Sequence, residues 1–244
     1  ILSSILGTLV KGIVFVSNAT KKNIIQKTYL VKFSKSKIKI IHNGVDIKIK
    51  SKKSISLFNE KKSIIKILML SRIERYKGHE DLVEGFSKLP KEIQNKYKIF
   101  FVGSGKPKFI KELKNKISYL KVNKNINFLN YLNFDSIRIL KSVDIFFSLT
   151  RDFEGFGYSI AESLLAETPV VSTKVGGVIE FLNKNNSELI DPKSPRKISQ
   201  ILIRFIKSRK HYKRKAINGK LLIKKKFNSD LMGEKFFNFF DKKI

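Results

Sequence analysis

The chain contains 244 residues, of which 42% are hydrophobic, and its 51 Lys and Arg against 20 Asp and Glu give a formal net charge of +31. A chain of this length can bury a substantial core, so it fits one large domain or one domain with part of another. Cysteine is absent, which excludes a disulfide framework and a thiolate metal site and suits a reducing compartment; the three histidines stand far apart, without the spacing of metal ligands.

The excess of positive charge leaves three interpretations of the surface open. Lysine occurs together with many Ile, Asn and Phe residues, as expected from an AT-rich genome, and this favours solvated lysine faces without a specific partner. An anionic membrane surface is the second interpretation. Only 8 of the 51 basic residues are Arg, the residue best suited to bidentate recognition of bases and phosphates, which argues against nucleic acid as the partner.

Residues 1–46 are predicted to be the tail of a preceding domain, because their pattern is too sparse for a core of their own. The first residues are apolar, but the stretch is interrupted by Lys11 and is shorter than the ~20 residues of a membrane span. It has neither a basic start nor a cleavage site, so it does not predict a signal peptide, and we expect the chain to begin in mid-protein. Strands at 12–17 and 38–41 and a helix at 18–30 are expected here.

Residues 47–62 are lysine-rich and poorly patterned, which predicts a linker, and a regular alternation begins after them. Strands are predicted at 66–71, 97–102, 125–129, 144–149, 169–172 and 187–190. Helices are predicted near 79–89, 106–120, 134–142, 158–166 and 177–183. Alternating strands and helices with short connections indicate an α/β fold, a Rossmann-like parallel sheet with helices on both faces, over residues 63–226.

The end of the chain is predicted to be helical and strongly basic. No acid occurs from residue 192 to 229, whereas 14 Lys and Arg do. Residues 227–244 then predict a terminal helix with a broad phenylalanine-rich face, which must pack against another surface.

In an open parallel sheet, ligands bind beyond the carboxyl ends of the strands. This rule predicts that one rim of the sheet carries the candidate site, formed by residues that directly follow the predicted strands: Arg72, Lys77, Gly103, Ser104, Gly105, Tyr131, residues 150–157 and residues 174–177.

The stretch from Asp144 to Gly177 carries the sharpest signal. A buried strand is followed by the glycine-rich turn Glu154-Gly155-Phe156-Gly157 and then by the start of a helix, which offers free N–H groups and a positive dipole end to an anion. Glu162 follows Glu154 by eight residues, about two helical turns. An anion cradle beside carboxylates that accept sugar hydroxyls suits a nucleotide sugar.

The other rim residues are weaker signals, and each has a structural explanation as well. Arg72 and Lys77 could clamp a diphosphate or be surface cations. The Gly103-Ser104-Gly105 motif could approach a nucleotide or be an ordinary strand-to-helix turn. Gly176 and Gly177 could offer N–H donors to phosphate or form a tight turn. His79, in a first helical turn, is interpreted as structural rather than catalytic.

These motifs, in this order, resemble those of the family 4 retaining glycosyltransferases, of GT-B fold. VSNATKKNI and IIHNGVD resemble the end of the family's acceptor domain and its interdomain link. SRIERYKG resembles its R-x4-K clamp, EGFGYSIAE its E-x7-E motif, and PVVSTKVGGVIE the strand and glycine turn that follow. The resemblance extends to about residue 206 and implies a fragment that carries the C-terminal, donor-binding half of the fold without most of the acceptor domain.

The resemblance also implies roles for individual residues. Arg72 and Lys77 would bind the diphosphate of the donor and stabilise the leaving group, and Glu154 would contact the transferred sugar. Glu162 would hold the ribose hydroxyls, while Gly155, Phe156 and Gly157 would offer backbone groups to the sugar and phosphates. The remaining rim residues would complete the donor site: Gly103, Ser104, Gly105, Tyr131, Gly176 and Gly177. Positive side chains and helix ends would absorb the departing charge, so neither a metal nor another cofactor is expected.

The expected function is therefore transfer of a hexosyl group, with retention, from a nucleoside-diphosphate sugar to a glycan or lipid-linked acceptor in cell-surface polysaccharide synthesis. The expected location is cytoplasmic, peripheral at the inner face of the membrane. A basic binding module for anionic membrane or nucleic acid, without transferase activity, is the alternative. The sequence leaves the base of the nucleotide open among UDP, GDP and ADP.

Overall fold

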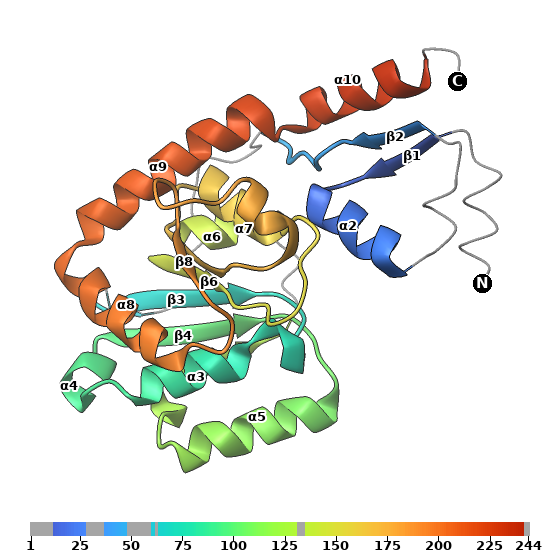
Figure 1. Cartoon of the computed structure of the whole chain (residues 1–244). Helices are drawn as coiled ribbons and strands as arrows, with labels where there is room; N and C mark the ends of the chain where they lie inside the picture. Colours follow the sequence, from blue (N-terminus) through green and yellow to red (C-terminus); the bar gives the residue numbers. More distant parts are fainter. Residues whose placement is uncertain (1–11, 28–36, 48–59, 62, 131–134, 242–244) are drawn as a thin grey trace.

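Figure 1 shows the computed structural model of the chain, which describes residues 12–27, 37–47, 60–61, 63–130 and 135–241. Its centre is a six-stranded sheet in the order β5-β4-β3-β6-β7-β8, in which every neighbouring pair is parallel. The strands are β3 (Ile65–Leu70), β4 (Tyr97–Val102), β5 (Ile126–Leu129), β6 (Ile145–Ser148), β7 (Val170–Thr173) and β8 (Glu188–Ile190). The predicted α/β fold is confirmed. The order reverses between β3 and β6, the place where open α/β sheets bind ligands.

Two layers of helices cover the sheet, because successive side chains of each strand point to opposite faces. Ile65, Ile67 and Met69 of β3 face one core cluster, and Leu68 faces the other. The first cluster includes residues of α3 (His79–Ser87), α5 (Pro107–Tyr119) and α8 (Pro195–Lys207). The second includes residues of α6 (Ser136–Lys141), α7 (Tyr158–Leu165) and α9 (Arg209–Lys226).

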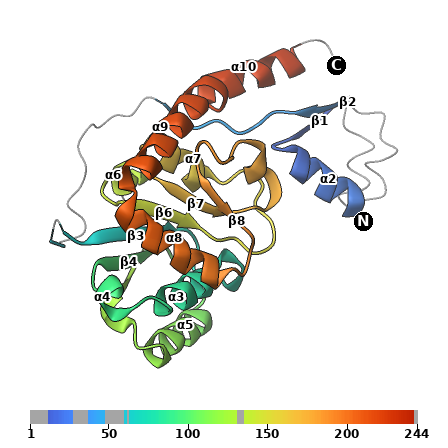
Figure 2. The same ribbon diagram turned by 60° about the vertical axis from the view of Figure 1, so that its left-hand side comes forward.

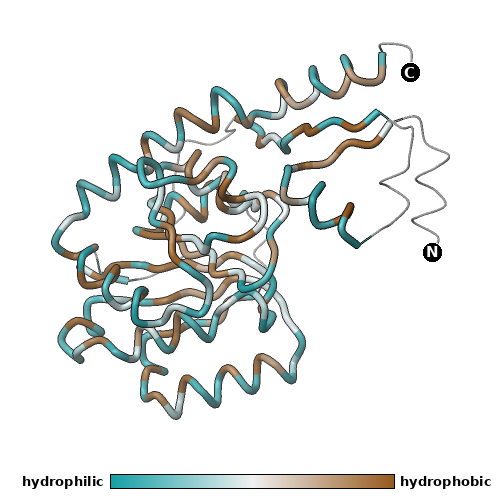
Figure 3. The backbone as a smooth tube through the Cα atoms, in the orientation of Figure 1, coloured by the Kyte–Doolittle hydropathy of each residue, from teal (hydrophilic) through white to brown (hydrophobic). Residues whose placement is uncertain are grey.

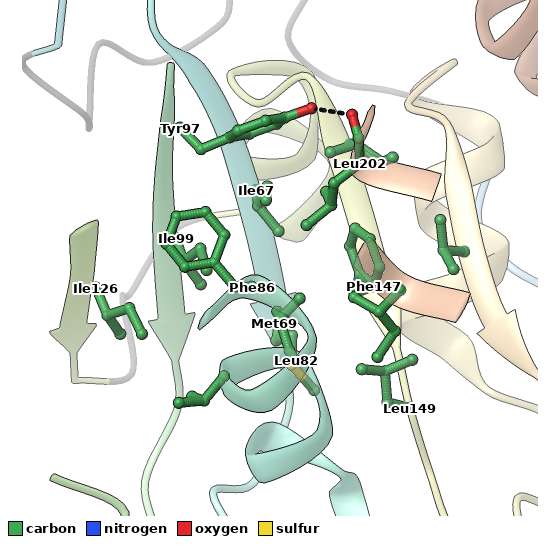
Figure 4. Close-up of a cluster of buried hydrophobic side chains, with 14 of the residues drawn as sticks. Ile67, Met69, Leu82, Phe86, Tyr97, Ile99, Ile126, Phe147, Leu149 and Leu202 are labelled. Carbon is green, nitrogen blue, oxygen red and sulfur yellow. Dashed lines mark hydrogen bonds between the residues drawn. The ribbon is translucent and has the colours of Figure 1, made fainter. Parts of the chain in front are cut away.

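Figure 4 shows the first cluster, in which Tyr97 is fully buried. The Tyr97 hydroxyl donates a hydrogen bond to the carbonyl oxygen of Leu202 at 2.6 Å. A buried hydroxyl needs a partner, and this one ties the start of β4 to α8. Burial raises the pKa of Tyr97 above its ordinary value, so the hydroxyl stays protonated as the donor.

A smaller parallel sheet lies beside the main domain, formed by β1 (Gly12–Phe15) and β2 (Lys37–Ile40). Helix α2 (Asn18–Lys27) follows β1, and Figures 1 and 2 place the terminal helix α10 (Ser229–Phe240) along the same side. The backbone of Val45 pairs with Asn228 just before α10 begins. The division into domains at 1–46, 47–62, 63–226 and 227–244 stays a prediction.

One predicted helix needs correction, and two details of the helices were not predicted. The stretch predicted as a helix at 177–183 is a short 3-10 helix, η4 (Gly176–Glu180), because Gly176 starts it with a positive φ and the chain leaves the helical conformation at Phe181. The basic end of the chain is helical, as predicted, and it forms two helices, α8 and α9, separated at Ser208. The short helix α4 (Lys91–Gln94) was not predicted. None of the helices in the described ranges combines the length and apolar character that crossing a bilayer requires.

Candidate functional site

A cavity of about 470 Å³ opens at the carboxyl ends of β3 and β4, on the predicted rim. The first residues of α7 and of α6 contribute to its wall, so two helix N-termini face it. Of the predicted site residues, seven line the cavity: Arg72, Lys77, Gly103, Ser104, Glu154, Gly157 and Glu162. The site therefore brings together residues that follow three predicted strands, β3, β4 and β6.

Lys77 and Glu154 form the closest charged pair of the cavity. The Nζ atom of Lys77 donates a hydrogen bond to Oε2 of Glu154 at 2.8 Å. The lysine side chain is only 16% exposed, so its ammonium group is held in place rather than solvated. An ammonium group has three N–H donors and this bond uses one, which leaves two for an anion in the cavity. Glu154 likewise keeps its second carboxylate oxygen for another donor.

Arg72 reaches the same cavity from a more open position, since its side chain is 65% exposed. Its guanidinium donates to Glu74 at 3.0 Å and to the hydroxyl of Tyr76. The ring of Tyr76 lies 5.8 Å from the Arg72 guanidinium carbon and 5.0 Å from Lys77 Nζ. One aromatic ring thus holds the two predicted clamp cations near each other.

Glu162 lies on the second turn of α7 and is half-buried in the wall of the cavity. Burial raises the pKa of Glu162 above its ordinary value, a hydrogen bond with the Ser136 side chain opposes the rise, and the carboxylate of Asp135 adds to it. The side chain of Ser136 is thus a hydrogen-bond partner of this carboxylate. The carboxylate can accept further hydrogen bonds from a ligand.

Arg151 fixes the loop that carries the two clamp cations. The sequence analysis placed it on the rim, within residues 150–157, but gave it no role of its own. Its guanidinium binds Asp81 through two hydrogen bonds, at 2.9 and 2.7 Å, and Glu80 at 3.0 Å. Its backbone N–H donates to the carbonyl oxygen of Tyr76 at 2.7 Å, next to Lys77. The end of β6 and the start of α3 are thereby joined on either side of the 72–77 loop.

Gly176 and Gly177 pack against the turn that carries Glu154. Gly176 has a φ of 58°, and a Cβ atom there would lie 2.1 Å from the carbonyl oxygen of Glu154. The N–H of Gly177 donates to that same oxygen at 2.7 Å, so it is engaged within the protein. Both glycines lie outside the cavity lining, and this geometry favours the tight-turn interpretation. Their contact with a donor stays a prediction.

Four other predicted site residues have positions away from the cavity lining or outside the described chain. The side chain of Phe156 is buried against Phe181 and Phe227 in the second core cluster. Gly105 lies beside the backbone of Ile73, with room for no side chain. Gly155 faces the N-terminal segment, where a Cβ atom would lie 3.5 Å from Thr20 Oγ1. Tyr131 lies outside the described residues. The predicted donor contacts of these residues stay untested.

Ser136 and Tyr158 line the cavity but were not identified from the sequence. A signal for Ser136 was present: Asp135 accepts a hydrogen bond from the N–H of Ile137 at 2.9 Å, as a typical N-cap does. Recognising Asp135 as the cap of this helix would have made Ser136 its first residue and placed Ser136 at the rim. Nothing in the local pattern indicated Tyr158. His79 is fully buried and outside the lining, in agreement with a structural role.

The N-terminal segment is joined to the site region through Glu180 of η4. Its Oε1 accepts a hydrogen bond from the N–H of Ala19 at 2.9 Å, and its Oε2 accepts one from the N–H of Asn18 at 3.2 Å. His42 Nε2 lies 2.9 Å from the same Oε2. Burial would raise the pKa of Glu180, but the hydrogen bonds from His42, Ala19 and Asn18 outweigh it, and the net shift is downward.

We expect Glu180→Ala to release α2, because no residue of this helix is buried and its first N–H groups depend on this carboxylate. Loss of such a cap costs about 1–2 kcal/mol, so amide hydrogen exchange in α2 should accelerate about tenfold or more. Glu188→Ala is the matched control, since Glu188 is equally enclosed (16% against 17% exposed) but pairs with Lys215 and Arg204. Equal exchange of α2 in both variants would contradict this role.

Among the described residues, no three His, Asp or Glu side chains gather in a way that could hold a metal ion. The expectation that the site works without a metal or other cofactor stays a prediction.

Comparisons with known proteins agree with the fold and with the resemblance to glycosyltransferases. Residues 48–222 match the family model described as glycosyl transferases group 1. An uncharacterised glycosyltransferase of Methanocaldococcus jannaschii is 28% identical over 221 residues, which are 88% of this chain and 54% of the relative. The N-acetyl-alpha-D-glucosaminyl L-malate synthase of Bacillus anthracis is 26% identical over 177 residues, 70% of this chain and 45% of that enzyme.

The chain thus spans about half the length of the curated relatives it matches. Among solved structures, the Anabaena HepE protein in complex with UDP and glucose superposes with a TM-score of 0.83 at 19% identity. The superposition covers 98% of this chain and 66% of the Anabaena chain. At this identity the likeness shows the fold alone.

Proposed function

The chain belongs to the glycosyl transferases group 1 family, and on this premise we propose that it is the donor-binding part of a retaining glycosyltransferase of family 4. The donor is a nucleoside-diphosphate sugar that gives a hexosyl group to a glycan or lipid-linked acceptor of the cell surface. Residues 1–46 belong to the acceptor-side domain in this proposal. The observation that carries it is one cavity holding the Lys77–Glu154 pair and the half-buried Glu162 at the switch point of the sheet.

Each group has a place in the proposed chemistry. The two free N–H donors of Lys77 and the guanidinium of Arg72 bind the diphosphate and stabilise the negative charge that develops as it leaves. The N-terminus of α7 adds its positive end to the same region. Glu162 accepts hydrogen bonds from the ribose hydroxyls, and the free oxygen of Glu154 accepts one from the sugar.

The membrane or nucleic-acid module without transferase activity is the weaker candidate for this cavity. Its wall contains two carboxylates, Glu154 and Glu162, which would repel a polyanionic backbone. Carboxylates are expected where sugar hydroxyls must be bound, because they accept hydrogen bonds from hydroxyl groups. Their presence supports the transferase proposal.

Calorimetric titration of UDP, GDP and ADP into the chain tests the proposal. We expect one of them to bind and Glu162→Gln to weaken it by about tenfold or more, because a hydrogen bond to a charged group contributes about 1.5–3 kcal/mol. The affinity should also fall on acidification, starting at a higher pH than for an ordinary glutamate, because the raised pKa of Glu162 brings protonation earlier. Glu162→Gln should remove that pH dependence.

Glu92→Gln, an exposed change on α4, is the matched control and should bind as the wild type does. If no nucleoside diphosphate binds, or if Glu162→Gln binds as tightly as the wild type, this use of the cavity is wrong.

A further inference from the structure

The outward face of α9 combines exposed cations with exposed aliphatic side chains, and none of them lines the donor cavity. Residues at successive helical turns form a line along this face: Lys210, Arg214, Ile217, Leu221 and Lys225. This spacing of four, three, four and four residues keeps side chains on one side of a helix. We call these five residues the outer stripe. All of them are exposed, and the two apolar members in its middle are 41% (Ile217) and 63% (Leu221) exposed.

The opposite side of α9 is fully engaged with the domain. Tyr212, Ala216, Gly219 and Ile223 are buried, and a Cβ atom on Gly219 would lie 2.5 Å from Leu164 of α7. The packing fixes the rotation of α9, so the outer stripe cannot turn inward. Figure 3 shows the helix as largely hydrophilic, in contrast to the sheet beneath it.

The cations along α9 divide into two groups. The paired ones are Arg209 with Asp144, Lys213 and Lys220 with Glu167, and Lys215 with Glu188. Within the described part of the chain no ion pair is formed by Lys210, Arg214 and Lys225 of the outer stripe, nor by Lys224 and Lys226 beside it. The stretch from 192 to 229 holds 14 Lys and Arg and no acid, so any carboxylate that neutralises these cations must come from another part of the chain. Positive charge that the fold leaves unbalanced surrounds two exposed aliphatic side chains.

From this combination we propose that the outer stripe docks the protein on an anionic lipid bilayer. A helix that lies in the membrane interface presents cations to the lipid phosphates and inserts apolar side chains between them. In the outer stripe the cations are Lys210, Arg214 and Lys225, and the apolar side chains that insert are Ile217 and Leu221. A nucleic-acid backbone would also attract the cations, but it offers nothing to bury the two aliphatic side chains in the middle of the stripe.

Sedimentation with vesicles of phosphatidylcholine containing about 30% phosphatidylglycerol, at ~0.1 M salt, tests this surface on the whole chain. The wild type should bind these vesicles and not vesicles of phosphatidylcholine alone. A charge variant, Lys210→Gln with Arg214→Gln and Lys225→Gln, should weaken binding on the order of 100-fold, at about fivefold for each cation. An apolar variant, Ile217→Gln with Leu221→Gln, should also weaken it, while the steepness of the salt dependence stays unchanged.

Matched controls lie on and after α5, which Figures 1 and 2 place at the other end of the domain from α9. Lys108→Gln with Lys111→Gln and Lys124→Gln removes the same charge from exposed positions, and Tyr119→Gln removes an exposed aromatic side chain. These controls should bind vesicles within about twofold of the wild type. Thermal unfolding of every variant shows whether it is folded.

Three results would overturn the proposal. If the control charge variant loses as much vesicle binding as the α9 charge variant, net charge rather than the outer stripe is responsible. If the apolar variant binds vesicles as the wild type does, no insertion takes place. If a random DNA duplex binds at the same salt, and more tightly than the vesicles, with the same loss in the α9 charge variant, the stripe is a nucleic-acid surface.

Discussion

Replacing Lys77 by alanine is expected to weaken binding of the nucleoside diphosphate by about 10- to 150-fold, which corresponds to the about 1.5–3 kcal/mol of charge-assisted hydrogen bonds. The lysine is 16% exposed and held 2.8 Å from Glu154, so its ammonium group is already oriented before the ligand arrives. The affinity for a nucleoside monophosphate should fall less in this variant, because a monophosphate offers fewer phosphate oxygens to Lys77 and Arg72. Calorimetric titration of both nucleotides measures the difference.

Lys174→Ala is the matched control for this change. Lys174 also lies at the carboxyl edge of the sheet, but it is 49% exposed, pairs with Asp191 and is outside the cavity lining. The control removes the same charge and should leave the affinity within about threefold of the wild type. If both variants weaken binding equally, the general positive field binds the nucleotide and Lys77 has no special role.

The double variant Lys77→Ala with Glu154→Gln separates two reasons for the loss. Removing the lysine alone leaves the carboxylate of Glu154 unpaired beside the anionic ligand, which adds repulsion to the lost hydrogen bonds. Neutralising Glu154 as well should therefore recover part of the affinity. Arg72→Ala should cost less than Lys77→Ala, since the arginine is largely solvated and Glu74 and Tyr76 already use two of its donors.

The sheet could be predicted from the sequence because each strand is a short apolar run that stands between helical patterns. Both faces of each strand are buried, which explains why these runs are continuous rather than alternating: in β3, for example, Ile67 faces one core cluster and Leu68 the other. The rim then followed from the topology, because the carboxyl ends of parallel strands lie at one edge. Glu154, Glu162 and Lys77 were found in this way, and they do meet at one cavity.

The direction in which each rim residue points could not be predicted, because it depends on packing between distant elements. Phe156 lies in the same motif as Glu154, yet its ring turns into the core to meet Phe227, 71 residues later in the chain. The sequence pattern suggested that the N–H of Gly177 could bind a ligand, but in the fold this N–H donates a hydrogen bond to the carbonyl oxygen of Glu154. The pairing of Arg151 with Asp81 spans 70 residues, and neither residue carries a local signal of it.

His79 should make the protein sensitive to acid. Its imidazole is fully buried at the start of α3, edge-on to Phe101 at 4.9 Å. Burial, with a smaller contribution from the charge of Lys77, lowers the pKa of His79 to about 3 from the ordinary 6.5. Below pH 6.5 the unfolded chain binds a proton at this residue that the folded chain does not, so stability must fall as the pH falls from about 6.5 toward about 3.

The expected loss approaches 1.36 kcal/mol per pH unit in that window, or about 2–3 kcal/mol between pH 7 and pH 4.5, a large part of an ordinary domain's stability of about 5–15 kcal/mol. His79→Gln cannot take up the proton, so its free energy of unfolding, measured with urea over this range, should fall less steeply by that amount. His211→Gln, at an exposed position, should follow the wild type. Parallel pH profiles for the wild type and His79→Gln would show that other groups carry the acid sensitivity.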